Sequence, residues 1–410
     1  MTSRNAAHVI VGASLAGAKA AEALRNQGYR GPLVLIGTEA DFPYERPPLS
    51  KGYLSGKDGR EKIFVHPEEW YAEQQIDLRL GTTVTAIDRD AHEVELADGS
   101  RIAYAKLLLT TGASPRRLPV PGAELAGVHY LRTVQDSDAL RELFASPKRL
   151  VVVGAGWIGL EATAAAREAG LEVTVLEAAE LPLLRVLGRE VAEVFADLHR
   201  AHGVDLRFGV RIESFEGGAD GRVSGVRLAD GTVVPADAVL VGIGAAPNTQ
   251  LAEAAGLPVR DGVLTDSALC TADPDVFAAG DAARAEHPQY GTAIRVEHWA
   301  NALNQPQTAA KSMLGEDAVY DRIPYFYTDQ FELGMEYVGY VEPDGYDRVV
   351  FRGDVPGKEF IAFWTKDGRV LAGMNVNIWD VTDPIRELVR SGRPVDLDRL
   401  ADQSVPLGEV

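Results

Sequence analysis

The sequence predicts an α/β protein with two doubly wound parallel sheets and a small α+β domain at its C-terminal end. The first observation is a near-repeat, in which two segments 142 residues apart (154 − 12) share one layout. Each has a strand, a tight glycine turn, a helix of small residues and a second strand ending in an acid, the order of a βαβ unit. The second observation is a change in amino-acid composition after residue 322, where aromatic residues cluster around a hairpin turn.

The two copies are expected to be separate domains, because they lie too far apart in the chain to share half a sheet comfortably. The first begins with HVIVGASLAG at His8, and its second strand ends at Thr38 and Glu39. The second begins with RLVVVGAGWIG at Arg149 and ends at Glu177. Short alternating strands around an Asp-Gly pair follow each copy and predict a hairpin layer.

Two later segments complete this outline. The stretch TDSALCTADPDVFAAGDAAR predicts a strand that ends at Gly280-Asp281, followed by the start of a helix. From Ile323 onward, YFYTDQFELGMEY and EFIAFWTKDGRVLAG predict strands, and a helix is expected at about Asp383–Arg390. These segments form the predicted C-terminal α+β domain.

Composition excludes several classes of protein. The chain has 410 residues, of which 46% are hydrophobic and 25% charged, and these are ordinary globular values. Its formal net charge of −19 argues against a general binder of nucleic acid or of anionic membranes, since both need a positive surface. The single cysteine, Cys270, excludes an intrachain disulfide, a redox-active cysteine pair and an iron–sulfur cluster on the chain's own thiolates.

No metal site and no membrane span are expected. His199 and His202 lie three residues apart on a predicted helix, and we interpret them as a solvated face because no further ligand is spaced nearby. No run approaches 18 apolar residues, the length that a membrane-spanning helix needs. The apolar stretch from His8 is too short for the hydrophobic region of a secretion signal and is interrupted by glycine. We therefore expect a cytoplasmic protein.

The second copy carries a complete G-x-G-x-x-G motif at Gly154, Gly156 and Gly159, between a strand and a helix. These glycines allow a tight turn, the close approach of a pyrophosphate and close packing of helix on strand. Glu177 follows 18 residues after the last glycine (177 − 159), where a carboxylate meets a ribose diol. The motif predicts a dinucleotide at the helix N-terminus. Glu177 suits an unphosphorylated ribose, although Arg185 could instead approach a 2′-phosphate on that ribose.

The first copy, Gly12-Ala-Ser14-Leu-Ala-Gly17, departs from this motif at its second glycine. Serine adds a small side chain where the backbone approaches phosphate most closely, and its hydroxyl could donate to that phosphate. Glu39 follows 22 residues after Gly17 (39 − 17), again at the ribose position. A second dinucleotide is expected here.

The stretch PYERPPLSK at Pro43–Lys51 resembles FAD-dependent ferredoxin reductases of bacterial cytochrome P450 and aromatic-ring dioxygenase systems. Similar segments include LLLTTGASPR, GWIGLE, VGIGAAPN, VEHWANALNQ and YFYTDQFE, so the resemblance covers nearly the whole chain. It implies a glutathione reductase-like fold. The implied domains are an FAD-binding domain at 1–113 and 246–321, an NAD-binding domain at 114–245 and the α+β domain at 322–410.

The resemblance also assigns cofactor contacts position by position. It implies FAD contacts at Gly12, Ser14, Ala16, Gly17, Thr38, Glu39, Arg46, Pro48, Lys51, Val84, Ala113, Arg132, Gly280, Asp281 and Trp299. It implies NADH contacts at Gly154, Gly156, Ile158, Gly159, Glu177, Arg185 and Gly244. Two of the FAD contacts compete with structural roles, because Val84 equally suits a core position and Arg132 a surface ion pair.

Individual roles follow from the same resemblance. Arg46 is expected on the diphosphate side of FAD and Lys51 beside the flavin ring. Asp281 is expected to accept from the ribitol hydroxyls, although it also suits a helix N-cap, and Trp299 to contact the isoalloxazine. The catalytic pair would be Lys51 and Glu161, where Glu161 has the alternative role of compensating a helix dipole.

The resemblance implies that the chain passes electrons from NADH through FAD to a small [2Fe-2S] ferredoxin. Hydride would go to flavin N5, and single electrons would then leave to the ferredoxin. The alternatives are an NADH oxidase or a rubredoxin reductase on the same scaffold, or a non-enzymatic interaction protein switched by its flavin. Neither nucleic acid nor membrane is an expected partner, and the chain is expected to be a monomer or weak homodimer. Arg295 and Lys311 are candidates for a basic docking patch, although a solvated-surface role suits each of them better.

Overall fold

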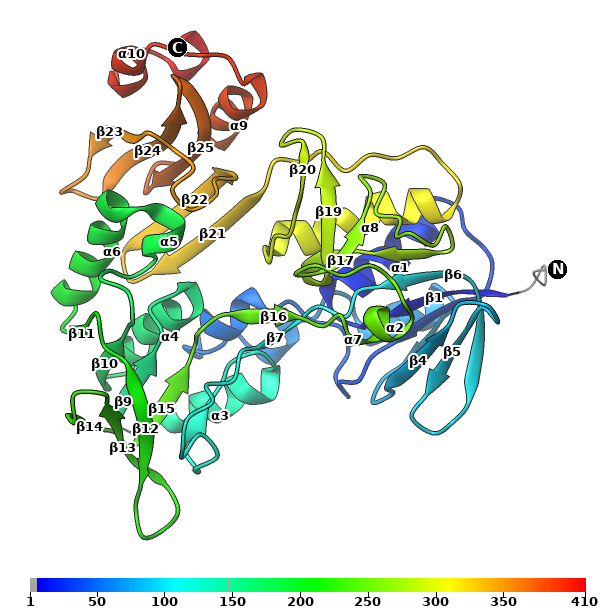
Figure 1. Cartoon of the computed structure of the whole chain (residues 1–410), viewed down its shortest axis with the longest axis horizontal. Coiled ribbons are helices and arrows are strands. Elements are labelled where there is room, and N and C mark those ends of the chain that lie inside the picture. Colours follow the sequence, from blue (N-terminus) through cyan, green and yellow to red (C-terminus); the bar gives the residue numbers. More distant parts are fainter. Residues whose placement is uncertain (1–5, 147) are drawn as a thin grey trace. The chain divides into compact units, whose positions relative to one another are not determined.

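The computed structural model describes residues 6–146 and 148–410, and the chain divides into two compact units (Figure 1). Of the described residues, unit 1 contains 6–46 together with Arg60–Ser114 and Ala245–Pro324. Unit 2 contains Pro47–Gly59, Pro115–Gly244 and Tyr325–Val410.

The main sheet of unit 1 has the strand order β3–β2–β1–β6–β5–β4, and β18 also pairs with β6. Its strands are β1 (Ala7–Val11), β2 (Leu33–Ile36), β3 (Ile76–Arg79), β4 (Val84–Asp88), β5 (Glu93–Leu96), β6 (Arg101–Leu109) and β18 (Val276–Ala278). β1, β2, β3, β6 and β18 pair in parallel, whereas β4, β5 and β6 form the predicted antiparallel hairpin layer. β1 lies between β2 and β6, so the sheet extends to both sides of its first strand, as in a doubly wound fold.

Helices α1 (Leu15–Asn26) and α8 (Trp299–Met313) pack on each other in unit 1. Close packing is possible because α1 is rich in alanine and buries most of its residues. The other elements of unit 1 are α2 (Glu68–Glu73), α7 (Gln250–Ala254), β17 (Val263–Thr265), β19 (Ala283–His287) and β20 (Thr292–Ile294), with the short helices η2 (Arg60–Lys62) and η3 (Gly280–Ala282). The short strands β7 (Ala113–Pro115) and β16 (Ala245–Pro247) pair where the chain passes between the units.

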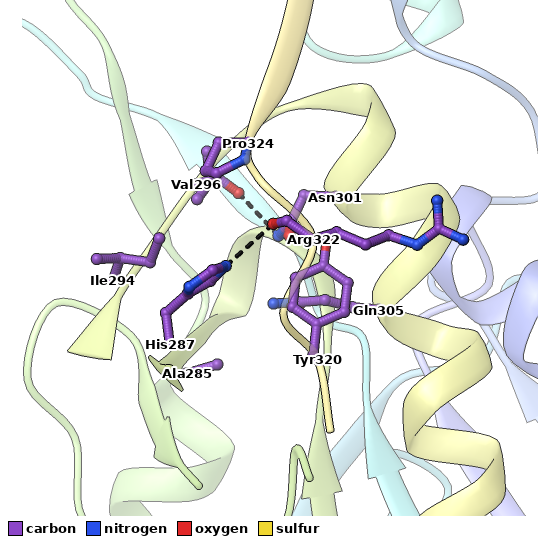
Figure 2. A pocket seen from close by; sticks show the side chains of 9 residues that line it. All are labelled: Ala285, His287, Ile294, Val296, Asn301, Gln305, Tyr320, Arg322 and Pro324. Atoms are coloured by element: carbon purple, nitrogen blue, oxygen red, sulfur yellow. Dashed lines mark hydrogen bonds between the residues drawn. The ribbon is translucent and has the colours of Figure 1, made fainter. Parts of the chain in front are cut away.

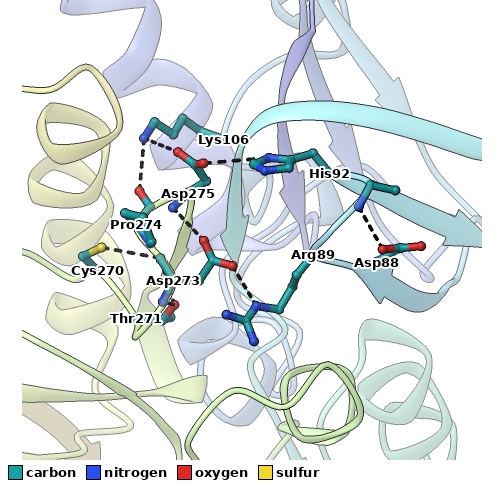
Figure 3. Close-up of polar contacts among 10 residues, drawn as sticks. Asp88, Arg89, His92, Lys106, Cys270, Thr271, Asp273, Pro274 and Asp275 are labelled. Carbon is teal, nitrogen blue, oxygen red and sulfur yellow. Dashed lines mark hydrogen bonds and ion pairs between the residues drawn. The ribbon is translucent and has the colours of Figure 1, made fainter. Parts of the chain in front are cut away.

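A group of ion pairs fastens the loop before β18 to the hairpin layer (Figure 3). Arg89 Nε lies 2.7 Å from Asp273 Oδ2, and Lys106 Nζ lies 2.6 Å from Asp275 Oδ1. Cys270 is half-buried at this loop and its thiol donates to the carbonyl of Asp273. The group holds the strand that leads to Gly280 in place.

Unit 2 contains a parallel sheet of strand order β11–β10–β9–β15–β8. These strands are β8 (Val128–His129), β9 (Arg149–Val153), β10 (Glu172–Leu176), β11 (Asp205–Arg207) and β15 (Ala238–Val241). The surrounding helices are α3 (Val134–Phe144), α4 (Trp157–Glu168), α5 (Leu184–Leu187) and α6 (Arg189–Ala201), and η1 (Pro47–Ser50) contacts α3 and α4. An antiparallel layer of β12 (Ile212–Gly217), β13 (Val223–Leu228) and β14 (Val233–Pro235) follows, as in the first copy.

The C-terminal segment adds an antiparallel sheet of order β21–β22–β25–β24–β23 to unit 2. It consists of β21 (Tyr325–Gln330), β22 (Leu333–Gly339), β23 (Arg348–Asp354), β24 (Glu359–Lys366) and β25 (Arg369–Val376), followed by α9 (Thr382–Ser391), α10 (Leu397–Ala401) and η4 (Leu407–Glu409). One apolar core contains Leu160 and Phe195 from α4 and α6 together with Trp364 from β24. The indole of Trp364 also donates to the carbonyl of Leu187 at 3.0 Å, so this sheet and the helices beside it are packed as one body.

The predicted fold class is confirmed, including the helix expected near Asp383–Arg390, which is α9. The helix expected to begin at Asp281 is wrong. A single 3₁₀ turn, η3, follows β18 there, and the chain continues directly into β19. Pairing of Val263–Thr265 with Ala283–Ala285 supplies a ladder for this segment, so the backbone extends instead of coiling.

Candidate functional site

The glycine turn between β1 and α1 is shaped by close backbone contacts in unit 1. Gly12 has φ +117°, and a Cβ on it would lie 2.1 Å from the carbonyl oxygen of Thr110. A Cβ on Gly17 would lie 2.0 Å from the oxygen of Gly12, so helix and turn touch through bare backbone. Both glycines are therefore required by the fold itself.

Serine fits the second position of this turn for a geometric reason. Ser14 has φ −116° and ψ −159°, an extended conformation that any residue adopts, and it is the N-cap of α1. Its side chain makes no capping hydrogen bond to the helix. The first N–H groups of α1 therefore have no side-chain cap from Ser14, as a pyrophosphate site at a helix N-terminus requires.

Glu39, at the end of the second strand, is held by neighbours from the PYERPP stretch. Arg46 Nη2 lies 2.7 Å from Glu39 Oε1, and the hydroxyl of Tyr44 donates to Glu39 Oε2. Burial lowers the pKa of Arg46, but Tyr44, Glu39 and Asp281 act in the opposite direction and raise it above its ordinary value. Thr38 is exposed beside Glu39 and its hydroxyl accepts from Thr83 at 3.4 Å.

The Gly280-Asp281 turn lies against the start of α1. A Cβ built on Gly280 would lie 3.2 Å from the Cβ of Ala16, and the amide of Gly280 donates to Gln305 Oε1 at 2.8 Å. Arg46 is close enough to Asp281 for their charges to interact. Unit 1 thus gathers Ser14, Ala16, Arg46 and Asp281, which were predicted from three distant segments.

Sequence reasoning did not select three further residues of this region. Trp299 Nε1 donates to Glu45 Oε2 at 3.1 Å, which orients the indole predicted to contact the flavin. Burial lowers the pKa of His298 to about 4, although the carboxylate of Asp281 acts to raise it. Glu45 and His298 each adjoin a predicted site residue inside PYERPP and VEHWAN, and that adjacency was the signal available. The third, Gln305, adjoins no predicted site residue.

A small cavity lies next to this region but is too small for a cofactor (Figure 2). Its volume is about 10 Å³, the space of a single water molecule. Gln305, Asn301 and His287 are among the residues that line it. We therefore do not regard it as the dinucleotide site.

The remaining predicted FAD contacts differ in their burial and in the unit to which they belong. Val84 and Ala113 are buried, and Val84 belongs to the apolar core beneath β4, which favours its structural alternative. Arg132 lies in unit 2, where its amide donates to Asp136 at the start of α3. Pro48 lies in η1, also in unit 2.

Unit 2 repeats the glycine turn between β9 and α4. Gly154 has φ +100°, and a Cβ on it would lie 2.4 Å from the carbonyl oxygen of Gly242, while a Cβ on Gly159 would lie 2.2 Å from the oxygen of Gly154. A Cβ on Gly156 would meet nothing within 4 Å. Gly156 therefore leaves open space beside the start of α4, whose N-terminus has no side-chain cap.

Glu177 is held at the end of β10 by two backbone amides. Its Oε2 accepts from the N–H of Ala155 at 2.7 Å, and its Oε1 accepts from the N–H of Ala179 at 2.8 Å. Arg185, by contrast, is exposed on the short helix α5. Ile158 is 45% exposed in the first turn of α4. Gly244 has φ +97° after β15.

Lys51 and Glu161 form an ion pair inside unit 2. Lys51 Nζ lies 2.8 Å from Glu161 Oε1, and the side chain of Glu161 is only 3% exposed. Glu161 also accepts from the hydroxyls of Ser50 at 2.5 Å and Thr328 at 2.6 Å. The ammonium of Lys51 lies over the ring of Tyr327, 5.4 Å from its centroid. Such a buried, fully paired carboxylate does more than compensate a helix dipole.

The structure corrects the expectation for His199 and argues against one of the two candidate docking residues. The solvated face predicted for His199 is wrong, because His199 is fully buried and bonds to Gln330. Arg295 is a poor docking residue, since its side chain is 10% exposed and pairs with Asp261 and Glu297, whereas Lys311 is exposed. Within residues 6–146 and 148–410 there is no group of three potential metal ligands and no helix long and apolar enough to cross a membrane.

Comparison with known proteins identifies the family. The profile of the pyridine nucleotide-disulphide oxidoreductases matches residues 6–306, and that of the reductase C-terminal domain matches residues 325–410. The chain belongs to the pyridine nucleotide-disulphide oxidoreductase family. With a single cysteine in the whole sequence, it lacks the cysteine pair from which the family takes its name.

Within this family the chain is similar to ferredoxin reductases, and the resemblance predicted from the sequence is confirmed. It is 40% identical over 406 residues to putidaredoxin reductase CamA of Pseudomonas putida, covering 98% of this chain and 96% of that protein. It is 40% identical over 400 residues to the ferredoxin–NAD(+) reductase component of the anthranilate 1,2-dioxygenase system of Burkholderia cepacia, covering 97% and 98%. The crystal structure of a covalent putidaredoxin reductase–putidaredoxin complex matches with a TM-score of 0.95 and 40% identity, covering 99% of this chain and 98% of that one.

Proposed function

We infer that the protein is an FAD-dependent NADH:ferredoxin reductase. The observation that carries this function is the pair of glycine turns, each at a helix N-terminus without a side-chain cap and each followed by a held carboxylate at the next strand end. Two such turns serve two dinucleotides, and the family supplies their identity as FAD and a nicotinamide nucleotide.

The residues of unit 1 fit an FAD diphosphate and ribitol. The amides at the start of α1 and the guanidinium of Arg46 would bind the diphosphate, and Asp281 would accept from ribitol hydroxyls. Glu45 would hold the indole of Trp299 in one orientation. FAD supplies the conversion of an electron pair from NADH into single electrons, which is chemistry that no side chain can perform.

The residues of unit 2 fit NADH. The open space at Gly156 would admit the pyrophosphate, and Glu177 would accept from the adenosine ribose. We assign 1–113 and 246–321 to FAD, 114–245 to NADH and 322–410 to the α+β domain. Lys51, held by Glu161, would place positive charge beside the flavin ring and favour its reduced form.

The electron acceptor would be a [2Fe-2S] ferredoxin of a P450 or ring-hydroxylating dioxygenase system. Because the chain has only Cys270, no internal disulfide can carry electrons onward, so they must pass from the flavin to an external acceptor. A cytoplasmic monomer or weak homodimer is consistent with this role.

The test is a comparison of acceptors with purified protein. The preparation should be yellow with one FAD per chain, and NADH should drive rapid reduction of a [2Fe-2S] ferredoxin. Reaction with rubredoxin alone would make the protein a rubredoxin reductase, and rapid oxygen consumption without any carrier would make it an oxidase. Slow flavin reduction with a long-lived NAD complex would instead indicate a flavin-switched interaction protein.

A further inference from the structure

A buried chain of hydrogen bonds leads from α6 to the Lys51–Glu161 pair within unit 2. His199 Nε2 lies 2.9 Å from Gln330 Oε1, Gln330 Nε2 lies 3.3 Å from the hydroxyl of Thr328, and that hydroxyl lies 2.6 Å from Glu161 Oε1. All four side chains are buried, with exposures between 0% and 4%.

The direction of every bond in this chain is determined from its carboxylate end. A carboxylate paired with an ammonium has no proton to give, so the hydroxyl of Thr328 donates to Glu161 and must accept from Gln330. The amide nitrogen of Gln330 therefore faces Thr328, and its oxygen faces His199. That oxygen can only accept, so His199 carries its proton on Nε2.

Alternation along β21 explains how one strand supplies two members of this chain. Thr328 and Gln330 are two residues apart, so both side chains point to the same face, where they are buried. His199 comes from α6 and Glu161 from α4, so the chain joins three elements that are distant in sequence. A buried polar chain with fixed directions holds its terminal group in one orientation.

We propose that Thr328, Gln330 and His199 are positioning residues that orient the carboxylate of Glu161 and thereby the ammonium of Lys51. This rests on the proposed function, in which Lys51 acts beside the flavin. Glu161 accepts from Thr328 and Ser50 as well as from Lys51, so part of its negative charge is satisfied by neutral donors. Loss of the Thr328 donor leaves more negative charge facing Lys51 and weakens the positive field that Lys51 provides.

The deciding variants are Thr328→Val, which removes the hydroxyl at nearly constant shape, and Thr328→Ser, which keeps it. In stopped-flow reduction by NADH without an acceptor, Thr328→Val should lower the limiting rate about tenfold, the effect of losing one hydrogen bond to a charged group. The NADH dissociation constant should stay within about twofold, because the group acts on the reacting centre and not on binding. The midpoint potential of the bound flavin should become more negative, and Thr328→Ser should restore both rate and potential.

A second variant tests the order of the chain and keeps the proposal testable if Thr328→Val does not fold. Gln330→Met should lower the limiting rate less than Thr328→Val does, since Thr328 keeps its hydroxyl but loses its orientation. In the double variant, Gln330→Met should add nothing to Thr328→Val, because the connection to Glu161 is already broken. Thr365→Val is the matched control, since the hydroxyl of Thr365 is equally buried but donates to the carbonyl of Arg348.

A wild-type limiting rate and potential in Thr328→Val would overturn the proposal, as would a Thr328→Ser variant as impaired as Thr328→Val. The reductive half-reaction needs no ferredoxin, so failure to find a protein acceptor would refute the proposed function and leave this test standing. Conversely, normal ferredoxin reduction with an unaffected Thr328→Val variant would refute the positioning chain alone.

Discussion

Glu177 should make the enzyme prefer NADH over NADPH, and the geometry at the end of β10 gives the reason. Its two oxygens are each held by a backbone amide, from Ala155 at 2.7 Å and from Ala179 at 2.8 Å. A carboxylate oxygen has a further lone pair, so both can still accept from the adenosine ribose. A 2′-phosphate would bring like charge to a carboxylate that the amides hold in place.

The size of the preference follows from these contacts. A hydrogen bond to a charged group contributes about 1.5–3 kcal/mol, and the phosphate of NADPH replaces only the 2′-hydroxyl, so the one lost bond would cost about 1.5–3 kcal/mol. That corresponds to a preference of about tenfold to a hundredfold in kcat/KM from the lost hydrogen bond, to which the repulsion between the two negative groups adds. Glu177→Ser should lower kcat/KM for NADH and raise it for NADPH, because both the acceptor and the repelling charge disappear.

The assay is the ratio of the two kcat/KM values, measured with one electron acceptor for both nucleotides. Glu172→Gln is the matched control, since it removes an exposed charge at the opposite end of β10 and should leave the ratio unchanged. Arg185→Ala tests the competing idea, because an arginine that binds a 2′-phosphate would lower NADPH use when removed. Equal use of NADH and NADPH by the wild type, or an unchanged ratio in Glu177→Ser, would refute the reasoning.

Three other outcomes are expected. Asp281→Ala should weaken FAD binding about tenfold to a hundredfold, since a charged acceptor of ribitol hydroxyls is lost. Titration of the apoprotein with FAD measures this affinity. An unchanged affinity would show that Asp281 does not belong to the FAD site. Lys51→Met and Glu161→Gln should each slow flavin reduction by NADH about tenfold or more with little change in NADH affinity; wild-type stopped-flow rates in both would leave the pair a structural role only. Burial lowers the pKa of His199 to about 4, below its ordinary value of 6.5. Between these pH values the unfolded chain binds more protons than the folded one. The protein therefore loses stability as the pH falls from about 6.5 to 4. Full protonation of His199 would cost about 3 kcal/mol of the free energy of unfolding. Denaturant unfolding at pH 7 and at pH 4.5 should therefore show a smaller loss of stability in His199→Gln than in the wild type.

The parallel sheets and glycine turns were predictable because their determinants are local. Gly12 and Gly154 precede helices at the spacing that the turn demands, and the strands around them are short apolar runs. The structure then shows the contact behind each glycine, with Thr110 and Gly242 as the neighbours that exclude a side chain. These neighbours are about 90 to 100 residues away in the chain, so the sequence pattern indicates the need for glycine without naming its partner.

The errors concern residues whose surroundings come from distant strands. Asp281 follows a pattern that suits a helix N-cap, yet pairing between β17 and β19 draws the next residues into a strand. His199 lies on a helix with polar neighbours and resembles a surface residue, yet β21 covers it and Gln330 meets its ring. In both cases a tertiary contact overrides a local preference.

The amino-acid sequence determined the two dinucleotide turns, their following acids and the absence of a cysteine relay, because each depends on residue type at short spacing or on a simple count. Tertiary structure decided which distant side chains meet: Lys51 with Glu161, and Thr328 and Gln330 with His199. Hydrogen bonds and ion pairs require atoms within about 3 Å of one another, and no periodicity in one segment specifies the position of another. The packing of β21 on α4 and α6 brings these groups together, so the proposed positioning chain is visible only in the folded protein.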